Sequence, residues 1–202
     1  MSQRPRHDHY QTLQVREQDG LHRLTLNRPQ QMNAVNAQMC RELGEYFHAL
    51  EDDPAVRVVL LDASGRNFCA GLDLSELDRI IAAGGGPAAG LQLQRAYSRI
   101  FVAMRRCPQP IIALVHGAAS GAGLALTLAS DVRYAAEDAR FNVAMARIGM
   151  TGCDVGISYF LPRSVGTSNA AEMMMGGRFV NAAKALRIGL VSEVAPRDQL
   201  ET

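Results

Sequence analysis

The sequence has little that would direct it to nucleic acid or to a membrane. Its 202 residues hold 21 lysine and arginine against 20 aspartate and glutamate residues, so no excess of one charge attracts a phosphate backbone or an anionic membrane surface. No apolar run approaches the roughly 18 residues of a membrane span, and residues 1–10 lack the apolar segment of a signal peptide. We therefore expect a cytoplasmic protein without nucleic-acid or membrane partners.

Cysteine is also scarce, and the common motifs for nucleotide cofactors are missing. The four cysteines are widely separated and form no Cys-x-x-Cys pair, which argues against a disulfide framework and against a zinc site. Gly-Lys-Ser/Thr is absent, and a Gly-x-Gly-x-x-Gly match fails because Leu126 stands where the third glycine is required. We expect no metal and no permanently bound cofactor.

The composition favours an ordinary globular fold, with 48% hydrophobic and 20% charged residues. We expect one domain over residues 11–202, preceded by a flexible tail over residues 1–10. The tail contains His7-Asp8-His9, which has the residue types of a metal cluster but no further ligand nearby.

Apolar periodicity predicts a mixture of strands and helices. An antiparallel hairpin is expected first, because two alternating segments flank a Gln-Asp-Gly turn. A helix capped by Asn36 follows, with Pro54 beyond its end. The predicted elements are the strands 12–17, 21–26, 56–61 and 111–115, and the helices from 36 to about 50, 91–107, 121–130 and 168–175.

Two segments, 68–73 and 116–123, expose backbone N–H groups with few side chains in the way, because they are rich in glycine and alanine. The second opens the small-residue helix 121–130, whose N-terminus has unpaired N–H groups and partial positive charge. Two such donors could hold one oxyanion of an acyl group. Close packing of backbones is the alternative explanation for these glycines.

The order of the motifs resembles that of the crotonase superfamily, the enoyl-CoA hydratases and isomerases. Across residues 12 to 195 the shared motifs are Asn27-Arg28-Pro29 with Asn33-Ala34, Phe68-Cys69-Ala70-Gly71-x-Asp73, His116-Gly117-x-x-x-Gly121-Ala122-Gly123, Ser130-Asp131 and Gly189-Leu190-Val191. The resemblance implies an α/β spiral of ββα units, assembled as homotrimers or as hexamers built from two trimers. The family's later helices have no counterpart before Thr202, so we expect the C-terminal helical region to be missing or truncated.

The resemblance also implies a CoA thioester as substrate, with its carbonyl oxygen held in an oxyanion hole between the backbone N–H groups of Leu72 and Ala122. It further implies that the backbone near these donors contacts the substrate. The substrate-binding residues implied in this way are Ala70, Gly71, Asp73 and Gly121.

The chain departs from the best-known hydratases at both of their catalytic glutamates, where it has Ala125 and Met145. Neither side chain can transfer a proton at neutral pH. Asp154 offers a replacement, because its loop resembles that of dienoyl-CoA isomerases, in which an aspartate beside Val-Gly moves a proton. Asp154 could instead cap the following helix. Both roles could coexist only if one carboxylate oxygen stayed free.

Several other residues could have roles at the site. His116 beside the second donor segment could act as a base, although a structural histidine is the alternative. Cys69 and Cys153 adjoin the site, but no neighbour in the sequence would depress the pKa of either thiol. Arg28 and Lys184 could contact CoA phosphates or be solvated surface charges.

These observations lead to two hypotheses about function. The first is an enzyme of enoyl-CoA hydratase/isomerase type, a lyase or isomerase of fatty acid metabolism, in which Asp154 moves the proton and isomerisation is favoured over hydration by two glutamates. The second is a non-catalytic acyl-CoA-binding or assembly subunit with a degenerate active site.

Overall fold

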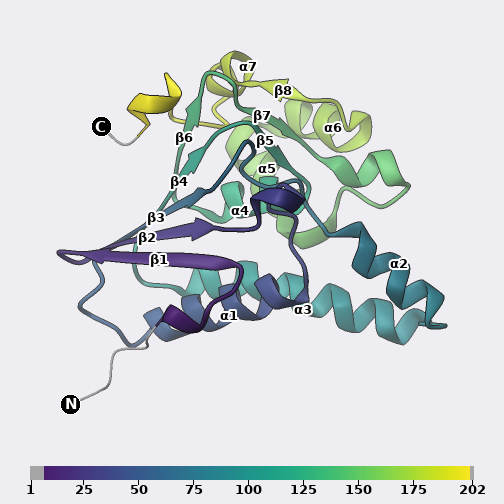
Figure 1. The fold of residues 1–202 in the computed structure, drawn as a ribbon. Coiled ribbons are helices and arrows are strands. Elements are labelled where there is room, and N and C mark those ends of the chain that lie inside the picture. The colour runs from purple at the N-terminus through teal and green to yellow at the C-terminus, as the bar shows by residue number, and fades with distance from the viewer. Residues whose placement is uncertain (1–6, 201–202) are drawn as a thin grey trace.

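The computed structural model describes residues 7–200, so most of the tail predicted over residues 1–10 lies outside the described part. A six-stranded sheet in the order β1-β2-β3-β4-β6-β9 forms the centre, and β5-β7-β8 form a smaller sheet (Figure 1). The strands are β1 (Leu13–Gln18), β2 (Leu21–Leu26), β3 (Val58–Ala63), β4 (Ile111–Val115), β5 (Ala118–Ser120), β6 (Val132–Ala136), β7 (Arg140–Asn142), β8 (Val180–Asn181) and β9 (Glu193–Ala195).

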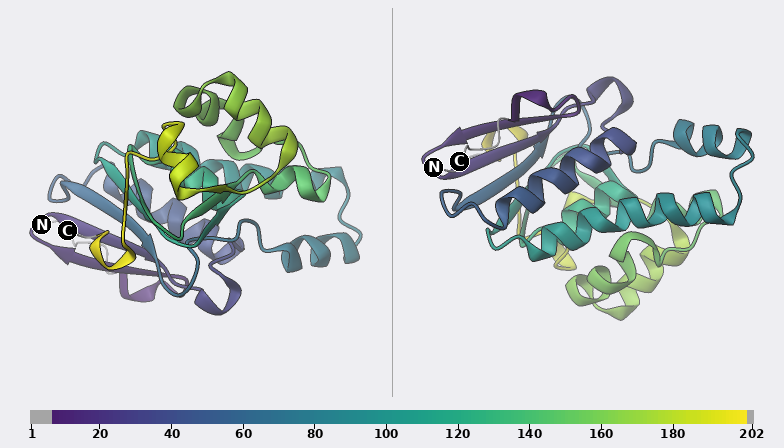
Figure 2. Two further views of the ribbon diagram at one scale, coloured as in Figure 1. Left: turned by 90° about the horizontal axis from the view of Figure 1, so that it is seen from above. Right: turned by 90° about the horizontal axis from the view of Figure 1, so that it is seen from below.

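Helices surround the large sheet. The two long helices α1 and α3 lie side by side below the sheet, and α5, α6 and α7 gather at the opposite side (Figures 1 and 2). The helices are α1 (Ala37–Leu50), α2 (Leu74–Ala82), α3 (Pro87–Arg106), α4 (Ala122–Ala129), α5 (Ile157–Val165), α6 (Thr167–Gly176) and α7 (Ala182–Arg187). None of the helices in residues 7–200 is long and apolar enough to cross a membrane.

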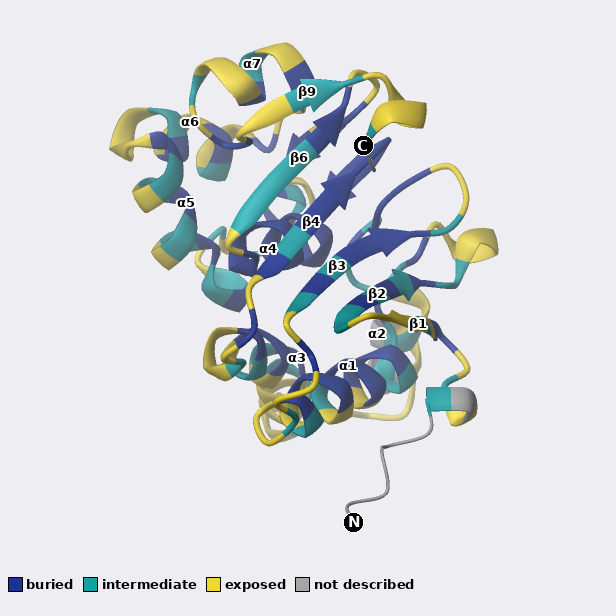
Figure 3. Cartoon of the chain, turned by 90° about the vertical axis from the view of Figure 1, so that its left-hand side faces the viewer, coloured by how far each residue is buried: buried dark blue, intermediate teal, exposed yellow. Residues whose placement is uncertain are grey.

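The mixed α/β class predicted from the sequence is confirmed. The hairpin of β1 and β2 is antiparallel, whereas β2, β3, β4, β6 and β9 pair in parallel. The predicted cap is also present, since the Asn36 side chain accepts a hydrogen bond from the Met39 amide at 2.9 Å. Figure 3 shows the central strands β3 and β4 largely buried between the surrounding layers.

Two predicted boundaries are displaced. The third strand begins at Val58 because the Arg57 amide donates to Gly20 O at 2.7 Å, which ties the preceding residues to the hairpin turn. The helix predicted from Leu91 begins at Pro87, because a proline in the first turn lacks only an N–H that would have no helical partner.

Residues 7–10, the described part of the predicted tail, contact neighbouring elements of the fold. His7 stacks on Tyr10 with ring centroids 5.5 Å apart and lies 5.5 Å from the Tyr46 ring, and its Nε2 is 3.5 Å from a Glu17 carboxylate oxygen. This end of the described chain therefore packs on β1 and α1.

Candidate active site

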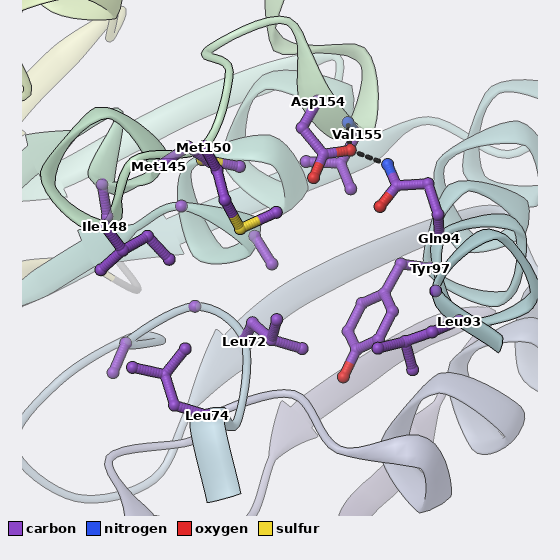
Figure 4. A pocket seen from close by; sticks show the side chains of 16 residues that line it. Leu72, Leu74, Leu93, Gln94, Tyr97, Met145, Ile148, Met150, Asp154 and Val155 are labelled. Atoms are coloured by element: carbon purple, nitrogen blue, oxygen red, sulfur yellow. Dashed lines mark hydrogen bonds between the residues drawn. The ribbon is translucent and has the colours of Figure 1, made fainter. Parts of the chain in front are cut away.

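A cavity of about 410 Å³ lies where the two donor segments meet α3 and the loop before α5. Figure 4 shows the side chains that surround it. The lining residues come from four parts of the chain and are mostly apolar. They are Ala70, Gly71, Leu72, Leu74, Gly90, Leu93, Gln94, Tyr97, Gly121, Ala122, Ala144, Met145, Ile148, Met150, Asp154 and Val155.

The two donor segments run alongside each other and are joined by backbone hydrogen bonds. The Cys69 amide donates to Ala118 O at 3.0 Å, and the Ser120 amide donates to Cys69 O at 2.9 Å. Gly123 makes this approach possible, since a Cβ at that position would lie 2.4 Å from Cys69 O. The close packing and the exposed amides that we weighed as alternatives therefore occur together.

Leu72 and Ala122 both line the cavity. The residues flanking Leu72 are tied to Val35, because the Val35 amide donates to Gly71 O at 2.7 Å and the Asp73 amide donates to Val35 O at 3.0 Å. Ala122 is the first residue of α4, where an N–H has no helical acceptor. In the part of the chain that the structure describes, neither the Leu72 amide nor the Ala122 amide donates to another residue.

Asp154 lies on the opposite side of the cavity, in a 3₁₀ turn over Asp154–Gly156. Its Oδ1 accepts hydrogen bonds from the Val155 amide at 2.6 Å and from Gln94 Nε2. Its Oδ2 accepts none from residues 7–200. Burial raises the pKa of the Asp154 carboxyl, and the Val155 N–H opposes that shift.

The helix-cap alternative for Asp154 is wrong. The residue that caps α5 is Gly156, and no side chain caps that helix. Asp154 is separated from it because Val155 has a φ of 46°, a left-handed conformation that is strained for a β-branched residue. Such strain is typical of functional sites.

Two further polar side chains line the cavity, Gln94 and Tyr97, both from α3. The Tyr97 hydroxyl donates to Val35 O at 2.7 Å, and burial raises the pKa of this phenol. The sequence placed Gln94 and Tyr97 three residues apart on one helical face but gave no sign of which face would line a cavity.

The remaining predicted binding residues divide into two groups. Ala70, Gly71 and Gly121 line the cavity. Asp73 does not, and it forms an ion pair with Arg28 at 3.1 Å. Burial would raise the pKa of Asp73, but hydrogen bonds from Ser75 and Arg28 outweigh it and lower the value.

Ala125 and Met145, the positions that the resemblance matches to the hydratases' glutamates, lie in different surroundings. Ala125 is 0% exposed within α4 and does not line the cavity, whereas the thioether of Met145 contributes to the wall.

The other candidate residues from the sequence lie outside the cavity lining. His116 is buried outside the cavity lining, where a ring nitrogen lies 3.2 Å from Gly65 O, and burial lowers its pKa. Burial raises the pKa of the Cys69 thiol to about 12, while Cys153 is exposed and outside the lining. Lys184 pairs with Glu172 at 3.0 Å. None of these four residues lines the cavity, as Asp154 does.

The sequence of the chain is similar to those of known proteins. Residues 16–202 match the family model described as enoyl-CoA hydratase/isomerase. A Mycobacterium leprae protein named "Probable enoyl-CoA hydratase echA12" is 39% identical over 179 residues, which are 88% of this chain and 61% of that protein. The human mitochondrial Delta(3,5)-Delta(2,4)-dienoyl-CoA isomerase is 35% identical over 198 residues, 94% of this chain and 60% of that protein.

A solved structure agrees with the fold. The crystal structure of an enoyl-CoA hydratase from Mycobacterium smegmatis superposes with a TM-score of 0.86 at 39% identity, covering 94% of this chain and 72% of the other. The chain spans about three fifths of the length of the curated relatives described above. Their names include both a hydratase and an isomerase, so similarity alone does not select the reaction.

Proposed function

Because the chain belongs to the enoyl-CoA hydratase/isomerase family, we propose that it binds an acyl-CoA or enoyl-CoA thioester in the cavity and stabilises its enolate. The Leu72 and Ala122 N–H groups would donate to the thioester oxygen as negative charge develops there. Two amides with no acceptor in residues 7–200, on residues that line one cavity, support this role. Removing one such donor typically reduces kcat by about 10²–10³.

Asp154 would move the proton. As a carboxylate it takes a proton from a carbon next to the double bond, and the electron pair of that C–H bond shifts to leave an enolate at the thioester. The protonated carboxyl then returns the proton to a different carbon of the same chain. The substrate gains and loses no atoms, so the reaction is a shift of the double bond.

Isomerisation is favoured because Asp154 is the only carboxylate among the lining residues. Hydration of the two-glutamate type would need a second carboxylate to activate water. Tyr97 is the only other lining residue whose side chain has an ionisable proton. Its hydroxyl donates a hydrogen bond to Val35 O. The carboxylate with one free oxygen is the observation that carries this proposal.

The resemblance supplies the remaining parts of the proposal. The protein would act as a homotrimer or hexamer in the cytoplasm, with a CoA thioester as its substrate and no resident cofactor. Light scattering on the purified chain measures the assembly directly, and a monomer at micromolar concentration would contradict the trimer.

The decisive experiment compares wild type with Asp154→Asn on 2-enoyl, 3-enoyl and 3,5-dienoyl-CoA thioesters, followed by ultraviolet absorbance and mass. We expect a spectral shift at constant mass, reduced about 10²–10⁴-fold in the variant because a proton-transfer group is lost. Asp52→Asn is the matched control, since Asp52 is exposed and outside the cavity lining.

Two results would contradict the proposal. A mass gain of one water would mean hydration. Binding of CoA thioesters by folded wild-type protein without any turnover would instead support a non-catalytic acyl-CoA-binding subunit.

A further inference from the structure

Gln94 faces Asp154 across the upper part of the cavity, and no part of the proposed reaction uses it. Its Nε2 donates to Asp154 Oδ1, and Figure 4 shows the second carboxylate oxygen turned away from the amide. Gln94 belongs to α3, whereas Asp154 belongs to the turn before α5, so this bond joins two segments 60 residues apart in the chain.

The arrangement at the carboxylate is asymmetric. Oδ1 receives both the Gln94 side-chain donor and the Val155 amide, while Oδ2 receives no donor from the described residues. Two donors from different elements hold Oδ1 in place. The carboxylate therefore cannot rotate to swap Oδ1 and Oδ2 without breaking both hydrogen bonds. Oδ2 is then the only oxygen of Asp154 available to a bound substrate.

We propose that Gln94 is a positioning residue that holds Asp154 Oδ1 and so makes Oδ2 the oxygen that exchanges the proton with the thioester substrate. This inference rests on the proposed function of Asp154. Gln94 itself would neither gain nor lose a proton, because a carboxamide is not ionised at neutral pH.

Among the described residues, Gln94 is the side chain that donates a hydrogen bond to the Asp154 carboxylate, and the other polar side chains nearby are bonded elsewhere or exposed. Among the elements packed against the turn, α4 has no ionisable side chain, and Tyr97 on α3 is committed to Val35 O. On α5 the Arg163 guanidinium stacks 3.8 Å from the ring centre of the exposed Tyr159. Arg95 and Arg99 on α3 and the neighbouring Cys153 are exposed to solvent.

Loss of the Gln94 donor should raise the pKa of the Asp154 carboxyl. A hydrogen bond to the ionised form of a carboxyl lowers its pKa, and the burial of Asp154 raises it. Without the amide, the carboxylate would be protonated at higher pH. The acidic limb of the kcat/KM profile would therefore move to higher pH, by about one unit for a single charge-assisted hydrogen bond.

The test compares Gln94→Met, Gln94→Glu and a control, Gln92→Met, which makes the same chemical change at an exposed position of α3 outside the cavity lining. In Gln94→Met we expect kcat to fall about 10-fold or more with a small change in KM, together with the shifted acidic limb. In Gln94→Glu the like charge beside Asp154 should move the limb further up. Gln92→Met should match wild type.

A readout without substrate accompanies the kinetics. The ¹³C shift of the Asp154 carboxyl carbon, assigned by its absence in Asp154→Asn, reports ionisation directly in each folded variant. We expect its midpoint to rise in Gln94→Met and Gln94→Glu.

The outcomes separate this inference from the proposed function. If Asp154→Asn is inactive while Gln94→Met keeps the wild-type pH profile and carboxyl midpoint, the positioning role is overturned and Asp154 keeps its own. If folded wild-type protein turns over no thioester, the proposed function and the positioning role both fall. A shifted limb and midpoint in Gln94→Met, absent from Gln92→Met, support the positioning role.

Discussion

The two sides of the cavity are built in different ways. One side is backbone, where the segments ending in Leu72 and Ala122 are joined by main-chain hydrogen bonds next to Cys69 and Ala119, both 0% exposed. The other side is made of side chains from α3 and from the loop over residues 144–155. The rim of the cavity is open, since Leu74 next to the first donor segment is 46% exposed and Ile148 in the loop is 49% exposed.

This difference separates what the fold determines from what individual side chains determine. Main-chain hydrogen bonds hold the two segments together, provided that glycine remains where a Cβ would collide with the neighbouring segment, as at Gly123. The proposed proton transfer would instead depend on a single side chain, Asp154, which a substitution can remove without disturbing the sheet. One family can therefore share a way to hold a thioester oxygen while its members, hydratases and isomerases by name, differ in reaction.

The largest loss of stability should follow a substitution that pushes the two donor segments apart. In Gly123→Ala the new Cβ would stand 2.4 Å from Cys69 O and 2.7 Å from Cys69 Cβ, and the carbonyl is fixed by its bond to the Ser120 amide. We expect a loss of about 3 kcal/mol from overpacking. That corresponds to a fall in Tm of roughly 6–12 °C for a chain of this length.

Gly44→Ala is the matched control, because a Cβ there meets nothing within 4 Å and Gly44 lies inside α1. Alanine in a helix interior should add about 0.5–1 kcal/mol. Thermal and urea unfolding of both variants measure the contrast. Equal Tm values for the two variants would show that the donor segments are not rigidly packed.

A smaller effect, on activity as well as on stability, should follow Gly71→Ala. Gly71 has a φ of 103°, which an L-residue rarely adopts, and a Cβ would lie 3.0 Å from Ser120 O. Relief of that contact would turn the adjacent Leu72 N–H, so we expect kcat to fall about 10²-fold, the cost of losing one oxyanion donor.

Activity assays alongside thermal unfolding separate the two consequences of Gly71→Ala. A folded variant with wild-type kcat would remove Leu72 from the proposed oxyanion hole. Loss of kcat with little change in KM for the CoA thioester would support a donor that acts in the transition state.

The fold was largely predictable because its signals are local. Asn36 caps α1 as expected, and the strand Ile111–Val115 has the predicted bounds, since both depend on residues close in sequence. The start of β3 could not be predicted in this way. It depends on the bond between the Arg57 amide and Gly20 O, which arises only when the hairpin turn packs beside the strand.

The candidate site was predictable in its backbone part and incomplete in its side-chain part. Small residues and glycines indicated where amides would be exposed, and these positions do border the cavity. Gln94 was missed because its partner is 60 residues away and an isolated glutamine on a helix has no distinctive pattern. The helix cap considered as an alternative role for Asp154 was wrong because the sequence did not reveal the left-handed backbone at Val155.

The smallest effect should come from Tyr97→Phe, which tests whether the two sides of the cavity are coupled. The Tyr97 hydroxyl on α3 donates to Val35 O, and the same carbonyl accepts from the Asp73 amide next to Leu72. Val35 O keeps that second donor in the variant, so we expect a loss of about 1 kcal/mol and a fall in Tm of roughly 2–4 °C.

Activity is the informative measurement on Tyr97→Phe, with Tyr159→Phe as the control because Tyr159 is 56% exposed. If the backbone side is held by its own hydrogen bonds, kcat should stay within about threefold of wild type, well below the effect of losing a donor. A fall of tenfold or more would mean that Tyr97 holds the Leu72 amide in place through Val35. The side-chain wall would then determine part of the oxyanion hole as well as the proton transfer.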